Sequence, residues 1–311
     1  MGGHAEYTAD KAGITRAVIT DFWGMVFNPS SMVRFSHVIM GAFIQGSFLV
    51  MSVSAFYYLK GKYNQFAVRS FIIALLIALI SSVAQLLIGH SHAQVVAEYQ
   101  PAKLAAYEGL YETTSEAPLY ILGYTDPDTR KTVGIKIPGM LSYLIYGDTA
   151  PAVKGLNEFP EEDWPPAGMV FQTYHIMVAL GMLFIGMTIL ALILIWRNQL
   201  FNHRWLLKLF VISVILPVFA NQLGWVSAER GRQPWIVQDL LRTSEGISKS
   251  VSATEVLISL SLFVVVYLLL FLVWVYVLDK EIRHGPEYPE DMPEIGFNKK
   301  ALRFDFFKKL K

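Results

Sequence analysis

The chain contains no cysteine. Disulfide bonds, thiolate metal ligands, iron–sulfur clusters and heme attached through a CxxCH motif are therefore excluded. A metal site in this protein must use histidine, methionine or carboxylate ligands instead. Charged residues are also scarce, at 16% of the chain, whereas soluble domains carry roughly 25%. The formal net charge is only +1, which gives no reason to expect a nucleic-acid partner.

Long hydrophobic runs are the main feature of the sequence. Hydrophobic residues make up 54% of the 311 positions, and five uncharged runs approach the ~20 residues that a helix needs to cross a bilayer. We therefore predict an all-α integral membrane protein with about five transmembrane helices. The predicted spans are residues 35–59, 70–88, 168–196, 205–228 and 254–278. The N-terminus has no basic region followed by an apolar core, so no cleavable signal peptide is expected.

A long polar segment separates the second and third spans. It contains eight prolines and one helical patch, PAKLAAYEGLYE, at positions 101–112. Loops beyond about 15 residues are usually functional or disordered, so we predict an ordered substrate-binding loop, with a mere linker as the alternative. The predicted organisation is an extracytoplasmic N-terminal segment (1–34), helices one and two (35–89), the long loop (90–167), helices three and four (168–228), an outer loop (229–253), helix five (254–279) and a cytoplasmic tail (280–311).

The positions of Lys and Arg predict the orientation in the membrane. Basic residues flank the short connections after the first and third spans and fill the tail after the fifth, and all three regions fall on one side. That side is predicted to be cytoplasmic, which places the N-terminus and the long loop outside. The basic residues behind this prediction are Lys60, Lys62, Arg69, Arg197, Arg204, Lys208, Lys280, Arg283, Lys299, Lys300, Arg303, Lys308, Lys309 and Lys311. On the outer side Arg230, Arg232, Arg242 and Lys249 reduce the contrast.

One stretch, GWVSAERGRQPW at positions 224–235, organises the functional interpretation. It places the carboxylate of Glu229 where the fourth span leaves the hydrocarbon, and a carboxylate at that depth needs a compensating charge. An arginine or a metal ion could supply it, and we favour a heme iron. Arg232 would then bind a heme propionate in two places, or it forms an ion pair with Glu229. Trp225 lies one helical turn before Glu229, where it packs on a macrocycle or belongs to an interfacial aromatic belt.

Further candidate iron ligands lie at the outer ends of the other spans. His37 opens the first span, and His175 and Met177 open the third. One His and one Met suit a low-spin heme, whereas a single ligand such as Glu229 suits a high-spin heme that keeps one face open for oxygen. Taken singly, Met177 is more often a core residue and a lone His an interfacial one. His90 and His92 are also interpreted as interfacial.

The long loop carries groups that could handle protons. A quinol loses two protons as it loses two electrons, so Glu108 is a candidate general base and Lys103 a candidate hydrogen-bond donor to a quinol oxygen. Their spacing alone is weak evidence, because a Lys and a Glu five apart on a helix are usually just solvated.

These motifs together resemble subunit I of the cytochrome bd quinol oxidases. The resemblance rests on four segments in the family's order: VRFSH (33–37), EYQPAKLAAYE (98–108), YHIM (174–177), and GW with ERGRQPW (224–235). It covers about residues 15–278. It implies that His37 and Met177 ligate the low-spin heme b, and that Glu229 ligates one member of a high-spin pair of heme b and heme d. It also implies a quinol-binding site that includes Gln100, Pro101, Lys103 and Glu108.

The sequence departs from this family in two ways. His175 stands where the family often has Arg, which leaves His175 as a competing ligand to Met177. The family's subunit I normally has nine spans, and this chain resembles the last five. We therefore expect a split subunit whose N-terminal half is a separate chain, with a truncated sequence as the alternative. The resemblance also implies a subunit II and small membrane subunits as partners.

The implied function is a quinol:oxygen oxidoreductase of a prokaryotic cytoplasmic membrane. Quinol would be oxidised at the outer loop, and electrons would pass through the low-spin heme to a high-spin pair shared with the partner chain. One alternative is a related electron-transfer cytochrome that does not reduce oxygen. A heme-free structural subunit and a transporter with a buried Glu–Arg pair are further alternatives.

Overall fold

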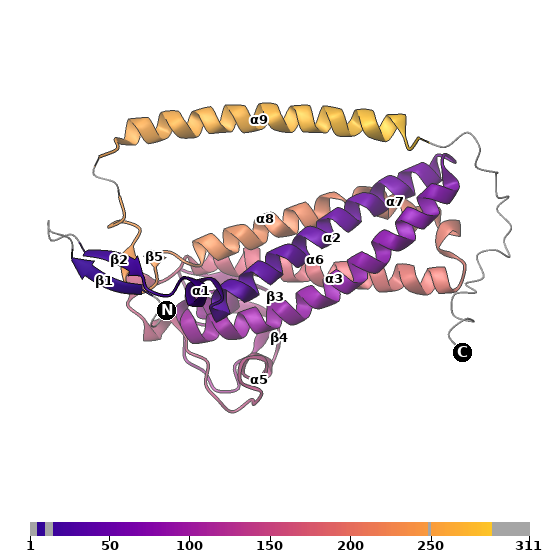
Figure 1. Ribbon diagram of the computed structural model, residues 1–311. Helices are drawn as coiled ribbons and strands as arrows, with labels where there is room; N and C mark the ends of the chain where they lie inside the picture. The colour runs from indigo at the N-terminus through magenta and orange to yellow at the C-terminus, as the bar shows by residue number, and fades with distance from the viewer. Residues whose placement is uncertain (1–4, 10–14, 248–249, 288–311) are drawn as a thin grey trace.

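The computed structural model describes residues 5–9, 15–247 and 250–287. Its long helices run side by side, with a loop domain and short hairpins gathered at one end (Figure 1). The five predicted spans are confirmed as helices long and apolar enough to cross a membrane. They are α2 (Pro29–Leu59), α3 (Asn64–Tyr99), α6 (Ala167–Trp196), the consecutive pair α7 (Arg204–Ile212) and α8 (Ile215–Arg230), and α9 (Ala253–His284).

Local sequence explains where two of these helices begin and break. The Asn28 side chain accepts the backbone N–H of Ser31 at 2.9 Å and Pro29 occupies the first turn, so α2 has a capped start. The fourth span is interrupted between α7 and α8, four residues before Pro217. Proline lacks an N–H and its ring clashes with the carbonyl four residues earlier, so a continuous helix is disfavoured here.

The second helix is longer than predicted. We placed the start of the long loop at residue 90, but α3 continues without interruption to Tyr99. His90 and His92 therefore belong to the helix and not to the loop. The extra turns carry this end of α3 to the loop domain, where Val96 is buried in its apolar core.

The membrane part of the molecule has an aromatic core between α2, α3, α6 and α7. Phe48 and Phe184 lie 4.9 Å apart between ring centroids, and Phe71 meets Phe210 edge-on at 5.1 Å. All four rings are buried, and such pairs contribute about 0.5–1.5 kcal/mol each beyond the area they bury. This core lies away from the end of the bundle that carries the loop, and it fixes the relative positions of the helices.

The long loop is an ordered domain and not a linker. After the helix α4 (Pro101–Glu108) the chain forms an antiparallel hairpin of β3 (Leu119–Asp126) and β4 (Lys131–Ile137), then the helix α5 (Met140–Tyr146). Two short 3-10 helices follow, at Leu156–Glu158 and Glu161–Asp163. The domain buries its own apolar cluster, which is separate from the aromatic core and includes Leu104, Leu141, Leu156 and Val170.

The sequence did not predict any strand. Besides the β3–β4 hairpin, β1 (Ala5–Ala9) pairs with β2 (Thr15–Ile19), and β5 (Trp235–Val237) pairs with β6 (Leu241–Arg242). A five-residue helix, α1 (Phe22–Val26), precedes α2. The described residues are therefore mostly helical, as predicted, and they include three small two-stranded sheets at one end of the bundle (Figure 1).

A stability prediction tests the order of the loop domain. The fully buried Ser142 hydroxyl accepts the backbone N–H of Ala117 at 2.9 Å. Ser142→Ala leaves that buried donor unpaired. We therefore expect the free energy of unfolding of the loop domain to fall by about 1–3 kcal/mol. Limited proteolysis of the purified protein measures the effect as faster cleavage within residues 100–166. Ser115→Ala, at an exposed position of the same loop, is the matched control and should leave cleavage unchanged.

The last helix stands apart from the bundle. Figure 1 shows α9 running alongside α2 and α8 without packing on them. Near its C-terminal end α9 makes polar contacts with the bundle, where Tyr57 Oη donates to Ile282 O at 2.8 Å and Tyr63 Oη to His284 O at 3.3 Å. No residue of α9 is buried, so the described part of the chain leaves its apolar surface uncovered.

Most of the predicted cytoplasmic tail lies outside the described residues, including Lys299 and Lys311. Lys249, in the predicted outer loop, also lies outside them.

Candidate functional site

The candidate residues gather at one end of the bundle. The start of α2, the end of α3, the start of α6 and the end of α8 reach the loop domain there, whereas the α2–α3 turn and α7 lie at the opposite end (Figure 1). The similar depth of His37, Met177 and Glu229 in a membrane stays a prediction. The side chains themselves contact different neighbours.

His37 lies between α2 and α3. Its ring centroid is 5.6 Å from that of His92, and Gly89 of α3 leaves room beside it. The Nδ1 atom of His37 is buried and has no hydrogen-bond partner among the described residues. A buried imidazole nitrogen without a partner is costly, and a metal ion is one of the few groups that could satisfy it. His92 was interpreted as interfacial, and no sequence pattern indicated its contact with His37.

Met177 lies between α6 and α8. A Cβ atom placed on Gly224 would come within 2.7 Å of the Met177 Sδ atom, so a larger residue at this position would displace the thioether. The glycine that precedes Trp225 thus lets the Met177 side chain lie directly against α8. His37 and Met177 therefore offer a nitrogen and a sulfur from two helices that both pack on α8. Within the described residues no group of three His, Asp or Glu side chains forms a metal site.

His175 does not compete with Met177. Its Nδ1 atom lies 3.0 Å from Phe171 O and its Nε2 atom 3.0 Å from Tyr120 O. Both ring nitrogens lie against carbonyl oxygens and the side chain is buried, so protein atoms occupy the space from which iron would approach either nitrogen. The competing-ligand hypothesis is thus contradicted by the geometry.

Glu229 forms an ion pair with Arg232, three residues later in the chain. The side chains of Glu229 and Arg232 are 41% and 40% exposed, and Trp225 is 63% exposed one turn earlier. The ion pair, one of the two alternatives for Arg232 in the sequence analysis, is therefore present. The Arg232 Nε atom is buried and has no hydrogen-bond partner within the part of the chain that the structure describes. Because the Glu229 side chain is partly exposed, the described chain does not enclose it by itself.

Lys103 connects the loop domain to the end of α8. Its Nζ atom donates to Ala228 O at 3.0 Å, which satisfies a carbonyl of the last helical turn. Gly231 makes this approach possible, because a Cβ there would lie 3.2 Å from Lys103 Cε. Burial, and then the positive charges of Arg34 and Arg232, lower the pKa of Lys103 to about 8.

Glu108 is buried, contrary to the prediction of a carboxylate at the outer surface. It is 1% exposed, and its Oε2 atom has no partner among the described residues. Burial raises the pKa of Glu108 to about 8, so the carboxyl group is largely protonated at neutral pH. The side chain is placed by α4, whose Tyr107 ring stacks on Tyr174 of α6 at 4.5 Å with an interplanar angle of 2°. The sequence missed the tyrosine pair because it joins segments 67 positions apart.

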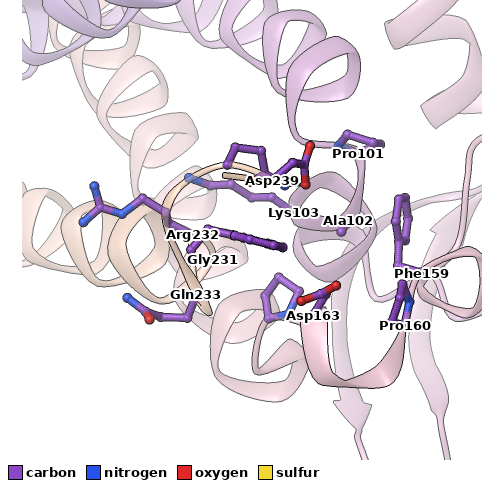
Figure 2. Close-up of a pocket in the computed structure, with 13 residues that line it drawn as sticks. Pro101, Ala102, Lys103, Phe159, Pro160, Asp163, Gly231, Arg232, Gln233 and Asp239 are labelled. Atoms are coloured by element: carbon purple, nitrogen blue, oxygen red, sulfur yellow. Dashed lines mark hydrogen bonds between the residues drawn. The ribbon is translucent and has the colours of Figure 1, made fainter. Parts of the chain in front are cut away.

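A cavity of about 150 Å³ opens between α4, the 159–165 segment and the turn after α8. Figure 2 shows Lys103 reaching from α4 toward Gly231 and Arg232, with Asp163 on another side. Pro101 also lines the cavity, and Gln100, which caps the start of α4, has a buried Oε1 atom without a partner among the described residues. The cavity thus joins the predicted quinol-loop residues to the GRQPW turn. Its full lining is Pro101, Ala102, Lys103, Phe159, Pro160, Asp163, Pro165, Gly231, Arg232, Gln233, Trp235, Gln238 and Asp239.

Comparisons with known proteins agree with this architecture. The chain is 38% identical over 283 residues to a Bacillus subtilis (strain 168) protein provisionally named cytochrome bd menaquinol oxidase subunit I, covering 88% of this chain and 62% of that protein. It is 35% identical over 285 residues to the cytochrome bd ubiquinol oxidase subunit 1 of the same organism, covering 88% and 61%. The chain therefore spans less than two thirds of the length of these relatives.

A solved structure shows the same fold. The bd oxidase from Geobacillus thermodenitrificans superimposes with a TM-score of 0.80 and 31% sequence identity, over 90% of this chain and 63% of that one. The family model described as cytochrome bd terminal oxidase subunit I matches residues 5–286, which include every site residue discussed above. The chain belongs to the cytochrome bd terminal oxidase subunit I family.

Proposed function

We propose that this chain is a heme-bearing membrane subunit of a cytochrome bd-type quinol:oxygen oxidoreductase. The observation that carries the proposal is the buried Nδ1 atom of His37, which has no hydrogen-bond partner among the described residues. The thioether of Met177, on another helix that packs on α8, lies against Gly224 and would be the second ligand. Both lie at the end of the bundle that bears the buried Lys103 and Glu108. Family membership and the shared fold support the same reading.

His37 and Met177 would hold a low-spin heme b, and Glu229 would ligate one member of a high-spin pair of heme b and heme d. The hemes supply one-electron transfer and, at the high-spin pair, oxygen chemistry. Arg232 offers its unpartnered Nε–H to an anionic propionate, since guanidinium groups bind carboxylates well. Trp225 presents an exposed ring on the same face as Glu229, where a macrocycle could lie against it.

The chain's own residues would handle the quinol protons. Glu108 would accept a proton once its carboxyl group is ionised, and Lys103 would hydrogen-bond a quinol oxygen while it anchors α4 to α8. Gln100 and Pro101 form the start of α4, and Pro101 lines the cavity together with Lys103. Because Glu108 is buried, the quinol headgroup must enter the interior of the loop domain to reach it.

We propose that polypeptide outside these 311 residues, equivalent to the part of the relatives that this chain does not cover, completes the oxygen site. A subunit II and small membrane subunits complete the proposed complex. The half-open Glu229 and the uncovered surface of α9 support partners on these faces. The proposed location is a prokaryotic cytoplasmic membrane, with the N-terminus and loop domain outside. Quinol protons would then leave outside while protons for water enter from the cytoplasm, so turnover would build a proton gradient.

The exposure of Glu229 also favours a second candidate. A related cytochrome could bind only the low-spin heme through His37 and Met177 and pass electrons to an acceptor other than oxygen. In that case Glu229 would remain paired with Arg232, as it is here.

One preparation distinguishes these functions. The complex is purified from its native membrane, its chains are identified by mass, and its reduced-minus-oxidised spectrum and quinol-driven oxygen consumption are recorded. The proposal predicts low-spin heme b with a high-spin pair, oxygen consumption, and a companion chain with further membrane spans. Low-spin heme alone, without oxygen consumption, would establish the electron-transfer alternative. A heme-free complex would contradict both.

A further inference from the structure

His175 connects two elements that the sequence holds far apart. Phe171 O lies one helical turn before His175 and already accepts its backbone N–H within α6. The bond that reaches a second element is therefore the one from Nε2–H to Tyr120 O in β3, across 55 residues at 3.0 Å. The ring also stacks on Phe171 with centroids 3.9 Å apart, which fixes its orientation.

A second contact from the same face of α6 reinforces this bond. Gln172, three residues before His175, donates from Nε2 to Gly123 O at 3.0 Å. A Cβ on Gly123 would lie 3.3 Å from the Phe171 ring, so glycine allows β3 to approach the helix closely. Two side chains of α6 thus bind two carbonyls of the same strand.

The hairpin that His175 holds is joined to α4. Thr132 of β4 donates from Oγ1 to Gly109 O at 2.6 Å, directly after Glu108. On the other side Tyr107 stacks on Tyr174, the neighbour of His175. The short helix that carries Lys103 and Glu108 is therefore held by the hairpin and by α6 together.

The same turn of α6 carries Met177. Two residues after His175, its thioether lies against Gly224 of α8. We propose that His175 is a positioning residue that fastens the β3–β4 hairpin to α6 and thereby holds the quinol-binding face of α4 in register with the heme ligand Met177. The roles of Glu108 and Met177 in this inference rest on the proposed function. The attachment of the β3–β4 hairpin to α6 rests only on the contacts of His175 and Gln172 with β3.

The test compares two substitutions in the purified complex. His175→Phe keeps an aromatic ring against Phe171 and removes the donor, whereas His175→Gln keeps a terminal N–H that can reach Tyr120 O. We expect His175→Phe to raise the quinol KM about tenfold, the effect of losing one buried hydrogen bond, with kcat at saturating quinol unchanged. The low-spin heme spectrum should stay, and His175→Gln should restore the KM. Thr173→Ala is the matched control, because its hydroxyl bonds only its own helix.

Hydrogen exchange gives a readout that does not depend on activity. Amides of residues 119–137 should exchange about tenfold faster in His175→Phe and at the wild-type rate in His175→Gln. Wild-type KM, or wild-type exchange, in His175→Phe would overturn the proposal. Loss of the low-spin spectrum in both variants would overturn it too, by making His175 a ligand. If the wild-type complex oxidises no quinol, the proposed function fails, while the exchange comparison still decides whether His175 fastens the hairpin.

Discussion

Replacing Met177 with leucine is expected to remove the low-spin heme spectrum from the purified complex while the high-spin absorbance largely stays. Leucine approximates the volume of methionine, so packing against Gly224 should be kept at a cost below about 1.5 kcal/mol. Leucine has no sulfur to offer iron. Losing a ligand outright should reduce heme affinity by more than the about 10- to 100-fold that follows from mutating a ligand's hydrogen-bond partner. Reduced-minus-oxidised spectra with pyridine hemochrome quantification measure the change.

The companion substitution is His37→Ala, which we also expect to remove the low-spin heme spectrum. The buried Nδ1 atom of His37 has no partner within the described chain, so its removal leaves no other polar group stranded. Met169→Ala is the matched control, because Met169 lies on the same helix as Met177 and is half exposed. If His37→Ala and Met177→Leu both keep a wild-type low-spin spectrum, the ligand assignment is wrong.

The second large effect is expected from Glu108→Gln. An amide fills the same buried space but cannot accept a proton, and general-base catalysis typically contributes about 10²- to 10⁴-fold. We therefore expect quinol oxidation to slow by about 100-fold while heme content stays at the wild-type level. Quinol-driven oxygen consumption and the heme spectrum of the same preparation measure the two quantities. Glu112→Gln, four residues later and exposed, is the matched control and should retain full activity.

The pH dependence follows from the burial of Glu108. Burial raises the pKa of its carboxyl group to about 8, and only the ionised form can act as a base. Wild-type quinol oxidation should therefore increase as the pH rises through about 8, and the Glu108→Gln variant should lack this rise. A wild-type rate that is flat from pH 6 to 9, or full turnover in Glu108→Gln, contradicts a base role.

The same pKa gives a check on folding. A carboxyl group whose folded pKa is raised stabilises the fold most below its unfolded value of 4.5, and this contribution is lost as the pH rises toward 8. Glu108→Gln does not ionise, so the variant should be at least as stable as the wild type at pH 8 and above. Thermal unfolding of both proteins at pH 6 and pH 8.5 separates a catalytic loss from a folding defect.

The sequence by itself determined the class of this protein and the identity of its candidate ligands. Hydrophobic runs near bilayer length can hardly form anything but helices in lipid, because every backbone N–H and C=O must be paired within its own segment. The five spans were therefore predictable from local composition, as was the helix α4 from its spacing and its proline start. Glu229 could be singled out because a carboxylate is unusual at the end of an apolar run. His37 and Met177 could be singled out only together with it and through the resemblance of their motifs to the family.

Only the tertiary structure decided which of these residues meet. The bond from His175 to Tyr120 O, the contact of His37 with His92 and the stacking of Tyr107 on Tyr174 join segments 55 to 67 residues apart. A local sequence pattern does not predict contacts between residues so far apart in the chain. The same holds for the burial of Glu108, since an isolated amphipathic helix would expose it to water. β1, β2, β5 and β6 were missed because they are short, and β3 because LYILGYTD does not alternate between apolar and polar residues. In β4 the alternation of Val133, Ile135 and Ile137 was a signal that the sequence analysis did not use. Pairing and burial depend on which surfaces the chain brings together, whereas helix formation in a membrane depends on each segment alone.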